Sequence, residues 1–232
     1  MAPFKFLVCA LFYGDFPALA QRCARSLRML RGTGLVDMRI GLNEVSPASR
    51  ALIDAELPGV ESIAADPQLY KYPMMRRLVH EYAGDATHLM WFDDDSCLAQ
   101  GLDAARWLGL VGQRAQMTQG TTGSVYRCAL TAPQKEWIRV QAWYTGRSLD
   151  QDAVFNLGAW FMAPLELFRR FDWPPPALRH NGGDSTLGVL CDQQGLAVLD
   201  CKGGVAINAD DSLAEYSAPR RGYSEPNLGL HG

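Results

Sequence analysis

Residues 87–97 read Thr-His-Leu-Met-Trp-Phe-Asp-Asp-Asp-Ser-Cys. The apolar run at 89–92 is long enough for one buried strand, and it stops at three adjacent carboxylates, Asp93, Asp94 and Asp95. Carboxylates that are buried without a partner are strongly destabilising, and a hard cation such as Mg²⁺ or Mn²⁺ removes that penalty. In an open α/β sheet, ligands bind beyond the carboxyl ends of the strands, where these aspartates are expected. A solvated acidic turn is the alternative interpretation.

The segments before this stretch alternate between apolar runs and amphipathic helices. Strands are predicted over 6–12, 36–42 and 60–64, and helices over 16–30, 46–56 and 70–82. The spacing of Leu19, Cys23, Leu27 and Leu30 gives the first helix one apolar face. This order predicts an α/β fold with a mostly parallel central sheet flanked by helices.

The second half is less regular. Helices are expected over 102–111, 164–171 and 185–194, and strands over 120–130, 137–143, 153–163, 197–201 and 205–207. The residues from 210 onward are polar and rich in Gly and Pro, which is typical of a tail or flap. Because no repeat and no linker is evident, residues 1–232 are predicted to form a single domain.

Composition limits the classes of partner. The net charge of −3 gives no general attraction to nucleic acid or anionic membranes. The six scattered cysteines include no Cys-x-x-Cys pair, which favours reduced thiols in a cytoplasm-like compartment. The apolar start is interpreted as a first strand rather than a signal peptide, because Tyr13-Gly14-Asp15 interrupts it. No apolar run reaches the length of about 18 residues that a membrane span needs, so no membrane association is expected.

Four segments, in this order, resemble GT-A glycosyltransferases of the family 2 kind. They are the opening strand with its polar turn, the strand that ends in Asp-x-Asp at 93–95, the glycine-containing strand around Gly158, and Gly183-Asp184 opening a helix that ends in glycine before a strand. The resemblance implies a GT-A domain with a nucleotide-sugar-binding half at 1–100 and a smaller, antiparallel acceptor-side half at 101–209.

The resemblance also implies a chemistry for the acidic residues. Asp95 would bind the divalent metal, Mn²⁺ or Mg²⁺, and Asp93 would hold the ribose or a water on the metal. Asp94 is a further nucleotide-side candidate, with simple solvation as the alternative. Asp184 would be the general base that deprotonates the acceptor hydroxyl, and its alternative is a helix N-terminal carboxylate that interacts favourably with the helix dipole. The donor would be a nucleotide sugar, most simply a UDP-sugar, and the reaction would invert the anomeric configuration.

This chain departs from the family pattern at two places. Gly183 stands where the family usually has Glu, which puts the assignment of the base in question. The third metal ligand is often a late His, whereas this chain offers Asn208, Asp210 or His231.

Further candidates rest on position alone. Tyr13 and Asp15 follow the first strand, where such folds bind the nucleobase, although a core role for Tyr13 is equally compatible. Lys71 and Arg76 are candidates for the diphosphate, with solvated helix charges as the alternative. Acceptor-side candidates are Gly158, Trp160 as an apolar platform with a core position as the alternative, His180 and Gly183.

The acceptor is the least determined feature. The chain resembles small phage-type transferases that glycosylate hydroxymethylated pyrimidines in DNA, which would act in the host cytoplasm, and the pairs Arg76-Arg77 and Arg169-Arg170 could contact phosphates. A saccharide or small-molecule acceptor is the simpler alternative. A sugar nucleotidyltransferase and a non-catalytic sugar- or metal-binding module are the other function classes.

Overall fold

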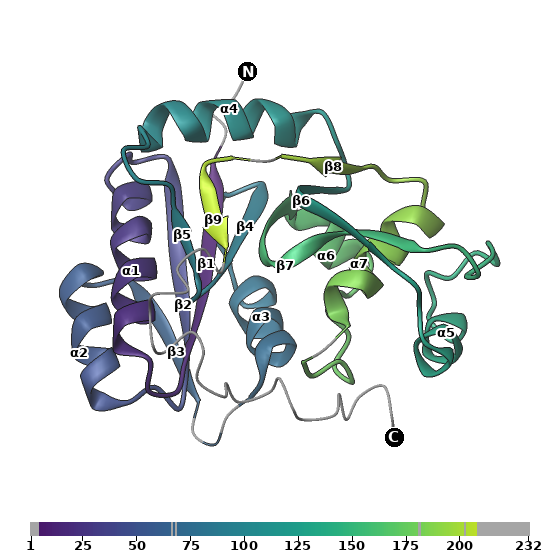
Figure 1. The fold of residues 1–232 in the computed structure, drawn as a ribbon, viewed down its shortest axis with the longest axis horizontal. Coiled ribbons are helices and arrows are strands. Elements are labelled where there is room, and N and C mark those ends of the chain that lie inside the picture. Colours follow the sequence, from purple (N-terminus) through teal and green to yellow (C-terminus); the bar gives the residue numbers. More distant parts are fainter. Residues whose placement is uncertain (1–4, 66, 68, 181, 202, 208–232) are drawn as a thin grey trace.

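A seven-stranded sheet forms the centre of the molecule (Figure 1). The computed structural model describes residues 5–65, 67, 69–180, 182–201 and 203–207. The strand order is β3-β2-β1-β4-β7-β6-β8. In chain order these strands are β1 (Phe6–Tyr13), β2 (Val36–Asn43), β3 (Glu61–Ala65), β4 (His88–Asp93), β6 (Thr121–Cys128), β7 (Ala153–Pro164) and β8 (Val198–Asp200).

The first four strands are parallel to one another, and β7 is the strand that runs against its neighbours. β7 is antiparallel to both β4 and β6, whereas β8 is parallel to β6. A second, two-stranded antiparallel sheet pairs β5 (Ser96–Leu98) with β9 (Val205–Ile207). The predicted α/β architecture with a mostly parallel sheet is confirmed.

Helices cover both faces of the large sheet because each strand directs alternate side chains to opposite sides. Phe6, Val8 and Ala10 of β1 join the core under α1 (Pro17–Arg31), α2 (Pro47–Glu56) and α4 (Ala104–Gln116). Leu7 and Cys9 join the core under α3 (Lys71–His80), α5 (Ala132–Arg139), α6 (Leu165–Arg170) and α7 (Gly183–Gln193). The apolar face predicted for the first helix is confirmed, since its Leu and Cys positions are all fully buried.

The prediction of a strand over 137–143 is wrong, because α5 occupies part of that segment. The side chain of Thr131 accepts a hydrogen bond from the backbone N–H of Gln134, and the Gln134 side chain accepts one from the backbone of Thr131. This capping box, with Pro133 in the first turn, begins a helix that continues to Arg139. The apolar spacing of Trp137 and Ile138 alone did not distinguish the two structures.

The strand β7 leaves both ladders in its middle. Its pairing with β4 ends at Phe92↔Trp160. Its pairing with β6 jumps from Gly123↔Phe161 to Val125↔Asn156. The backbone of residues 157–159 is therefore available to bind other groups, as expected for an irregularity of the bulge type.

No helix among the described residues is both long enough and apolar enough to cross a membrane.

Candidate active site

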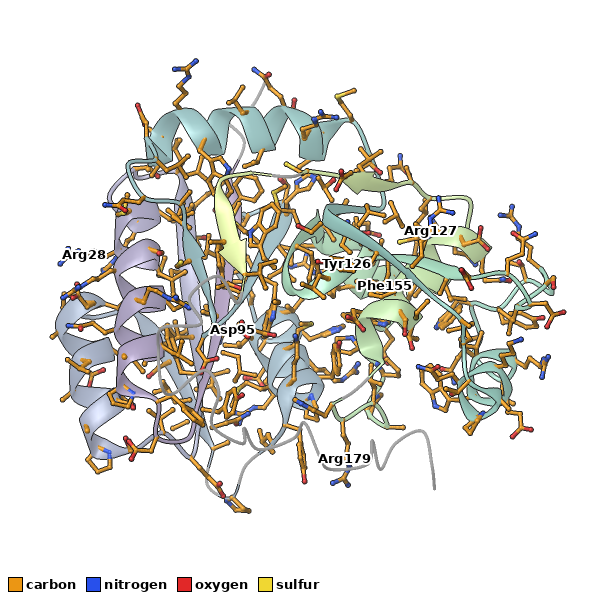
Figure 2. The ribbon with its side chains drawn as sticks, viewed as in Figure 1. Arg28, Asp95, Tyr126, Arg127, Phe155 and Arg179 are labelled. Atoms are coloured by element: carbon orange, nitrogen blue, oxygen red, sulfur yellow. The ribbon has the colours of Figure 1, made fainter. Side chains whose placement is uncertain are left out.

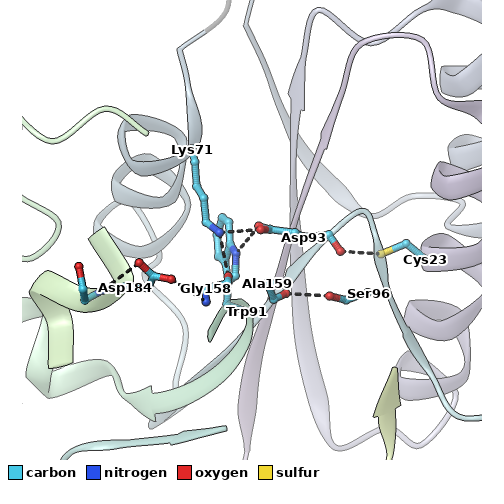
Figure 3. Close-up of polar contacts among 9 residues, drawn as sticks. Cys23, Lys71, Trp91, Asp93, Ser96, Gly158, Ala159 and Asp184 are labelled. Atoms are coloured by element: carbon cyan, nitrogen blue, oxygen red, sulfur yellow. Dashed lines mark hydrogen bonds and ion pairs between the residues drawn. The ribbon is translucent and has the colours of Figure 1, made fainter. Parts of the chain in front are cut away.

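Asp93, the last residue of β4, is held by two side-chain donors (Figure 3). The indole N–H of Trp91 donates to Oδ1 at 2.8 Å, and the ammonium of Lys71 donates to Oδ2 at 2.6 Å. The thiol of Cys23 lies 3.7 Å from the backbone oxygen of Asp93. Lys71 is buried, so the alternative of a solvated helix charge is wrong for this residue.

The backbone of Gly158 links Asp93 and Lys71 to Asp184. Nζ of Lys71 also donates to the Gly158 oxygen at 2.8 Å, and the Gly158 N–H donates to Oδ2 of Asp184 at 3.3 Å. The backbone N–H of Ser185 donates to the other carboxylate oxygen of Asp184 at 2.9 Å. One residue in the irregular part of β7, Gly158, thus connects the end of β4, the start of α3 and the start of α7 through its backbone N–H and oxygen (Figure 3).

Tyr72 packs beneath the start of α7. A Cβ placed on Gly183 would lie 2.1 Å from Cζ of the Tyr72 ring, so a larger residue does not fit at position 183 without displacing that ring. Burial raises the pKa of the Tyr72 phenol well above its usual value, and the carboxylates of Asp184 and Asp93 raise it further. The phenol therefore stays neutral beside both carboxylates. The space beside Gly183, one of the acceptor-side candidates, is filled by the Tyr72 ring.

The other two aspartates are buried behind the strand end. Asp94 is 1% exposed and Asp95 is 5% exposed, so the interpretation of the triplet as a solvated turn is wrong. Nη2 of Arg22 donates to the backbone oxygen of Asp95 at 3.2 Å. Burial raises the pKa of the Cys23 thiol well above its usual value, and the charges of Asp94 and Asp95 add to this effect.

The donor set at the strand end fits a small divalent cation. Asp93 and Asp95, two positions apart in the sequence, both carry carboxylate oxygens. Mg²⁺ is usually bound by one or two carboxylates together with the phosphates of a substrate. Within the described ranges there is no cluster of three or more His, Cys, Asp or Glu side chains placed to hold a metal. The third-ligand candidates Asn208, Asp210 and His231 lie outside the described residues.

The nucleobase candidates lie at the end of β1. Tyr13 packs its ring edge-on against Phe16, with 5.6 Å between the ring centroids. Oδ1 of Asp15 accepts a hydrogen bond of 2.5 Å from the hydroxyl of Ser46, which caps α2. The end of β1 is next to the end of β4 in the sheet, because Leu11 pairs with Asp93.

Two of the predicted residues make contacts within the protein. Arg76 donates to the backbone oxygens of Asp172 and Pro174 and to the Asp172 carboxylate, so it fixes the segment after α6. Trp160 is 1% exposed and packs against Trp107 of α4, with 5.9 Å between the ring centroids. The core alternative for Trp160 is therefore correct, and in this structure the indole presents no surface to an acceptor.

His180 precedes α7 and lies beside Tyr70, with 6.3 Å between the ring centroids. The backbone N–H of Tyr72 donates to the oxygen of the neighbouring Arg179 at 3.1 Å. The segment that carries His180 is thus attached to the start of α3, on the same side of the sheet as Asp184.

Sequence reasoning missed Trp91, Tyr72 and Ser96. The hydroxyl of Ser96 donates to the oxygen of Ala159 at 2.9 Å, which ties β5 to the irregular part of β7. Trp91 and Tyr72 lie in segments whose sequence predicts core residues. The available signal for a polar role was their closeness in the sequence to Asp93 and Lys71.

No protein-family model matches the sequence, and no curated protein matches it. Solved structures match the fold. The mannosyltransferase PcManGT from Pyrobaculum calidifontis, in complex with GDP-Man and Mn²⁺, has a TM-score of 0.58 at 13% identity, and the match covers 94% of this chain and 58% of that one. Residues 1–349 of S. aureus TarS give a TM-score of 0.57 at 8% identity, covering 90% and 62%.

A Bacillus anthracis protein assigned as a glucose-1-phosphate thymidylyltransferase gives a TM-score of 0.52 at 9% identity, covering 90% of this chain and 92% of that one. This chain thus spans about three fifths of the mannosyltransferase and most of the thymidylyltransferase. At these identities the similarity establishes the fold: it is the GT-A-like fold found in nucleotide-sugar-dependent glycosyltransferases and in a nucleotidyltransferase.

Proposed function

We propose that the protein is a metal-dependent glycosyltransferase that moves a sugar from a nucleotide sugar to an acceptor hydroxyl. The arrangement of two carboxylates around the backbone of Gly158 carries this proposal: Asp184 accepts its N–H, and Asp93 is linked to its oxygen through Lys71. Asp93 closes the strand where a nucleotide diphosphate would bind, and Asp184 opens a helix on the other side of Gly158. Such a site has one acidic group for the donor side and a separate one for the acceptor side, as a transferase requires.

In this proposal Asp184 accepts the proton of the acceptor hydroxyl. The acceptor oxygen then forms a bond to the anomeric carbon while the bond from that carbon to the diphosphate oxygen breaks, which inverts the anomeric configuration in one displacement. The proton ends on Asp184 and the electron pair on the diphosphate. Asp93 and Asp95 would hold a divalent cation, which would supply positive charge to stabilise the departing diphosphate.

The donor is proposed from both sequence and similarity. The family resemblance implies a UDP-sugar, and the mannosyltransferase of the same fold was solved with GDP-Man and Mn²⁺. Tyr13 and Asp15 remain the candidates for binding the nucleobase, because they lie at the end of β1, the strand adjacent to β4. Uridine and guanosine nucleotides are therefore the first donors to compare.

A sugar nucleotidyltransferase is the second candidate, favoured by the similarity that covers 92% of the thymidylyltransferase. Such enzymes usually carry a Gly-rich basic loop after the first strand, whereas this chain has Tyr13-Gly14-Asp15-Phe16-Pro17. The two activities give different products. A nucleotidyltransferase releases pyrophosphate from a nucleoside triphosphate and a sugar 1-phosphate, and a glycosyltransferase releases a nucleoside diphosphate from a nucleotide sugar.

The deciding experiment is a thermal-shift panel of nucleoside diphosphates, nucleoside triphosphates and nucleotide sugars, each with and without Mn²⁺. A ligand that binds only the native state raises Tm by mass action, and at about 100 times its Kd it adds about 2.7 kcal/mol. We expect one nucleoside diphosphate and its sugar to raise Tm only when Mn²⁺ is present. The isosteric variant Asp95→Asn should lose that metal-dependent shift.

Asp54→Asn is the matched control, because Asp54 is exposed on α2 and pairs with Arg50 on its own helix. It should shift like the wild type. No shift with any nucleotide would contradict the proposed function. A metal-dependent shift that survives in Asp95→Asn would remove Asp95 as a ligand.

A further inference from the structure

Tyr126 presents an exposed aromatic ring on β6. Its side is set by β7, because Tyr126 pairs with Phe155 across the antiparallel ladder and paired residues share a face of the sheet. The two rings lie 6.5 Å apart at an interplanar angle of 32°, and Figure 2 shows them side by side. Phe155 is buried, whereas Tyr126 is 50% exposed. Phe155 thus supports a ring whose outer surface is free to contact a ligand.

This aromatic pair adjoins the helix that carries Asp184. A Cβ placed on Gly188 of α7 would lie 2.6 Å from Cβ of Phe155, so helix and strand are in direct contact there. Asp184 lies about one helical turn before Gly188. It is also bonded to Gly158, three residues beyond Phe155 on the same strand. Phe155 of β7 therefore lies between Tyr126 on β6 and the helix that carries Asp184.

Two carboxylates, Asp184 and Asp152, act on the residues beside this aromatic pair. Cys128 lies two residues beyond Tyr126 on β6 and so faces the same side. Partial burial raises the pKa of its thiol, and the carboxylates of Asp184 and Asp152 raise it further. Arg127, between these two residues, points to the opposite face.

Three of the arginines that could have suited a polyanion pair with carboxylates elsewhere. Arg25 and Arg28 of α1 both pair with Glu56 of α2, at 2.9 and 2.7 Å. Arg76 pairs with Asp172. A phosphodiester beside Asp184 and Asp152 would meet like charge, which is unfavourable in a partly desolvated site.

We propose that the acceptor is a neutral saccharide and that Tyr126 is the platform on which its ring stacks, with the reacting hydroxyl directed toward Asp184. This inference rests on the proposed glycosyltransferase function. An aromatic ring offers an apolar face to the C–H face of a sugar and a hydroxyl at its edge for a hydrogen bond. A polar, uncharged ring also avoids the repulsion that Asp152 and Asp184 impose on an anion. Tyr126 thereby takes the role that the sequence had suggested for Trp160.

The test is saturation-transfer NMR on the protein with Mg²⁺ and the nucleoside diphosphate selected by the thermal-shift panel. The probes are the methyl glycosides of glucose, galactose, mannose and N-acetylglucosamine, together with lactose and maltose. A 12-nucleotide single strand that contains hydroxymethylcytosine is the rival probe. We expect at least one saccharide to bind the wild type. The substitution Tyr126→Ala should raise the Kd for that saccharide about tenfold.

Tyr126→Phe should retain most of this affinity, because the ring face remains. Arg127→Ala is the matched control, since it removes the exposed neighbour that points the other way, and it should bind as the wild type does. The inference is overturned if no saccharide binds, if saccharide binding survives Tyr126→Ala, or if the oligonucleotide binds in a Tyr126-dependent manner. The metal-dependent nucleotide shift, measured on the same samples, separates the two proposals: if it persists, only the acceptor inference has failed.

Discussion

The part of the molecule from β1 to β4 and the part from β6 to α7 build their ends of the site in different ways. In the first part, the pairing of β1 with β2 runs without a break from Phe6↔Val36 to Tyr13↔Asn43, and β4 joins in the same direction. Asp93 is placed simply because the strand ends there. In the second part, β7 runs against its neighbours and its register is interrupted at 157–159.

This interruption is what brings the acceptor-side carboxylate into place. Were Gly158 part of an unbroken ladder, its N–H and C=O would bond to neighbouring strands. Instead the N–H donates to Asp184 and the oxygen accepts from Lys71. A regular sheet thus provides the donor-side acid, and an irregular strand provides the acceptor-side acid and the link between the two.

The largest expected effect is the loss of Asp184 as a base. Asp184→Asn keeps the size of the side chain and an oxygen that can accept from Gly158, but it removes the charge that takes up the proton. Because general base catalysis typically contributes about 10²–10⁴-fold, turnover should fall by about that factor. Donor binding, measured by the metal-dependent thermal shift, should remain within about twofold of the wild type.

Asp192→Asn is the control for that variant, since Asp192 is exposed in the last turn of the same helix. It should retain wild-type turnover. Full activity in Asp184→Asn would rule out this residue as the base and would direct attention to His180, on the segment before α7.

The same contrast explains how far the sequence could predict the molecule. Between β1 and β4, the apolar periods and the cap at Ser46 agreed with one another, and every strand and helix was found within a few residues. Asp93 and Asp95 were predicted as site residues because carboxylates at the end of a buried strand need a partner such as a divalent cation. Local pattern and tertiary structure coincide there.

Beyond β5 the local pattern is insufficient. A capping box determined α5, and the apolar spacing of Trp137 and Ile138 pointed to a strand instead. Trp160 and Tyr126 are both strand aromatics, and which of them faces solvent depends on the interrupted register and on α4, which covers Trp160. Lys71 was predicted as a site residue, but its bond to Gly158 depends on a contact between residues 87 positions apart.

Lys71 is the residue through which the two parts are coupled, and Lys71→Met tests that coupling. The variant leaves the Gly158 oxygen and one oxygen of Asp93 without their cationic donor. Breaking a buried ion pair costs about 3–5 kcal/mol. Since the Asp93 side chain is 23% exposed, we expect a loss of roughly 2–4 kcal/mol in the free energy of unfolding, measured by urea denaturation.

Two variants make this measurement specific. The double variant Lys71→Met/Asp93→Asn should lose less free energy of unfolding than the sum of the losses in the two single variants, because the two side chains form one pair. Lys135→Met removes the exposed pair with Asp150 and should cost no more than about 1 kcal/mol. If Lys71→Met and Lys135→Met destabilise the protein equally, the buried pair does not couple the two parts.

The smallest expected effect is a change in stability when glycine is replaced by alanine in α7, which packs against the irregular strand β7. A Cβ on Gly188 would lie 2.3 Å from the backbone oxygen of Val154, and a backbone atom cannot move aside as a flexible side chain can. Gly188→Ala should therefore destabilise the protein by about 1–3 kcal/mol, in the range found for overpacked cores. Because α7 shifts away from β7, transfer activity should fall while nucleotide binding is retained.

Gly109 provides the matched substitution on α4, since it is exposed and a Cβ there would meet nothing within 4 Å. Alanine is favoured over glycine in a helix, so Gly109→Ala should stabilise the protein by up to about 1 kcal/mol. Urea midpoints of the two variants should then lie on opposite sides of the wild type. If both variants are stabilised, the contact between α7 and β7 is looser than the structure shows, and the position of Asp184 would have to come from the Gly158 hydrogen bond alone.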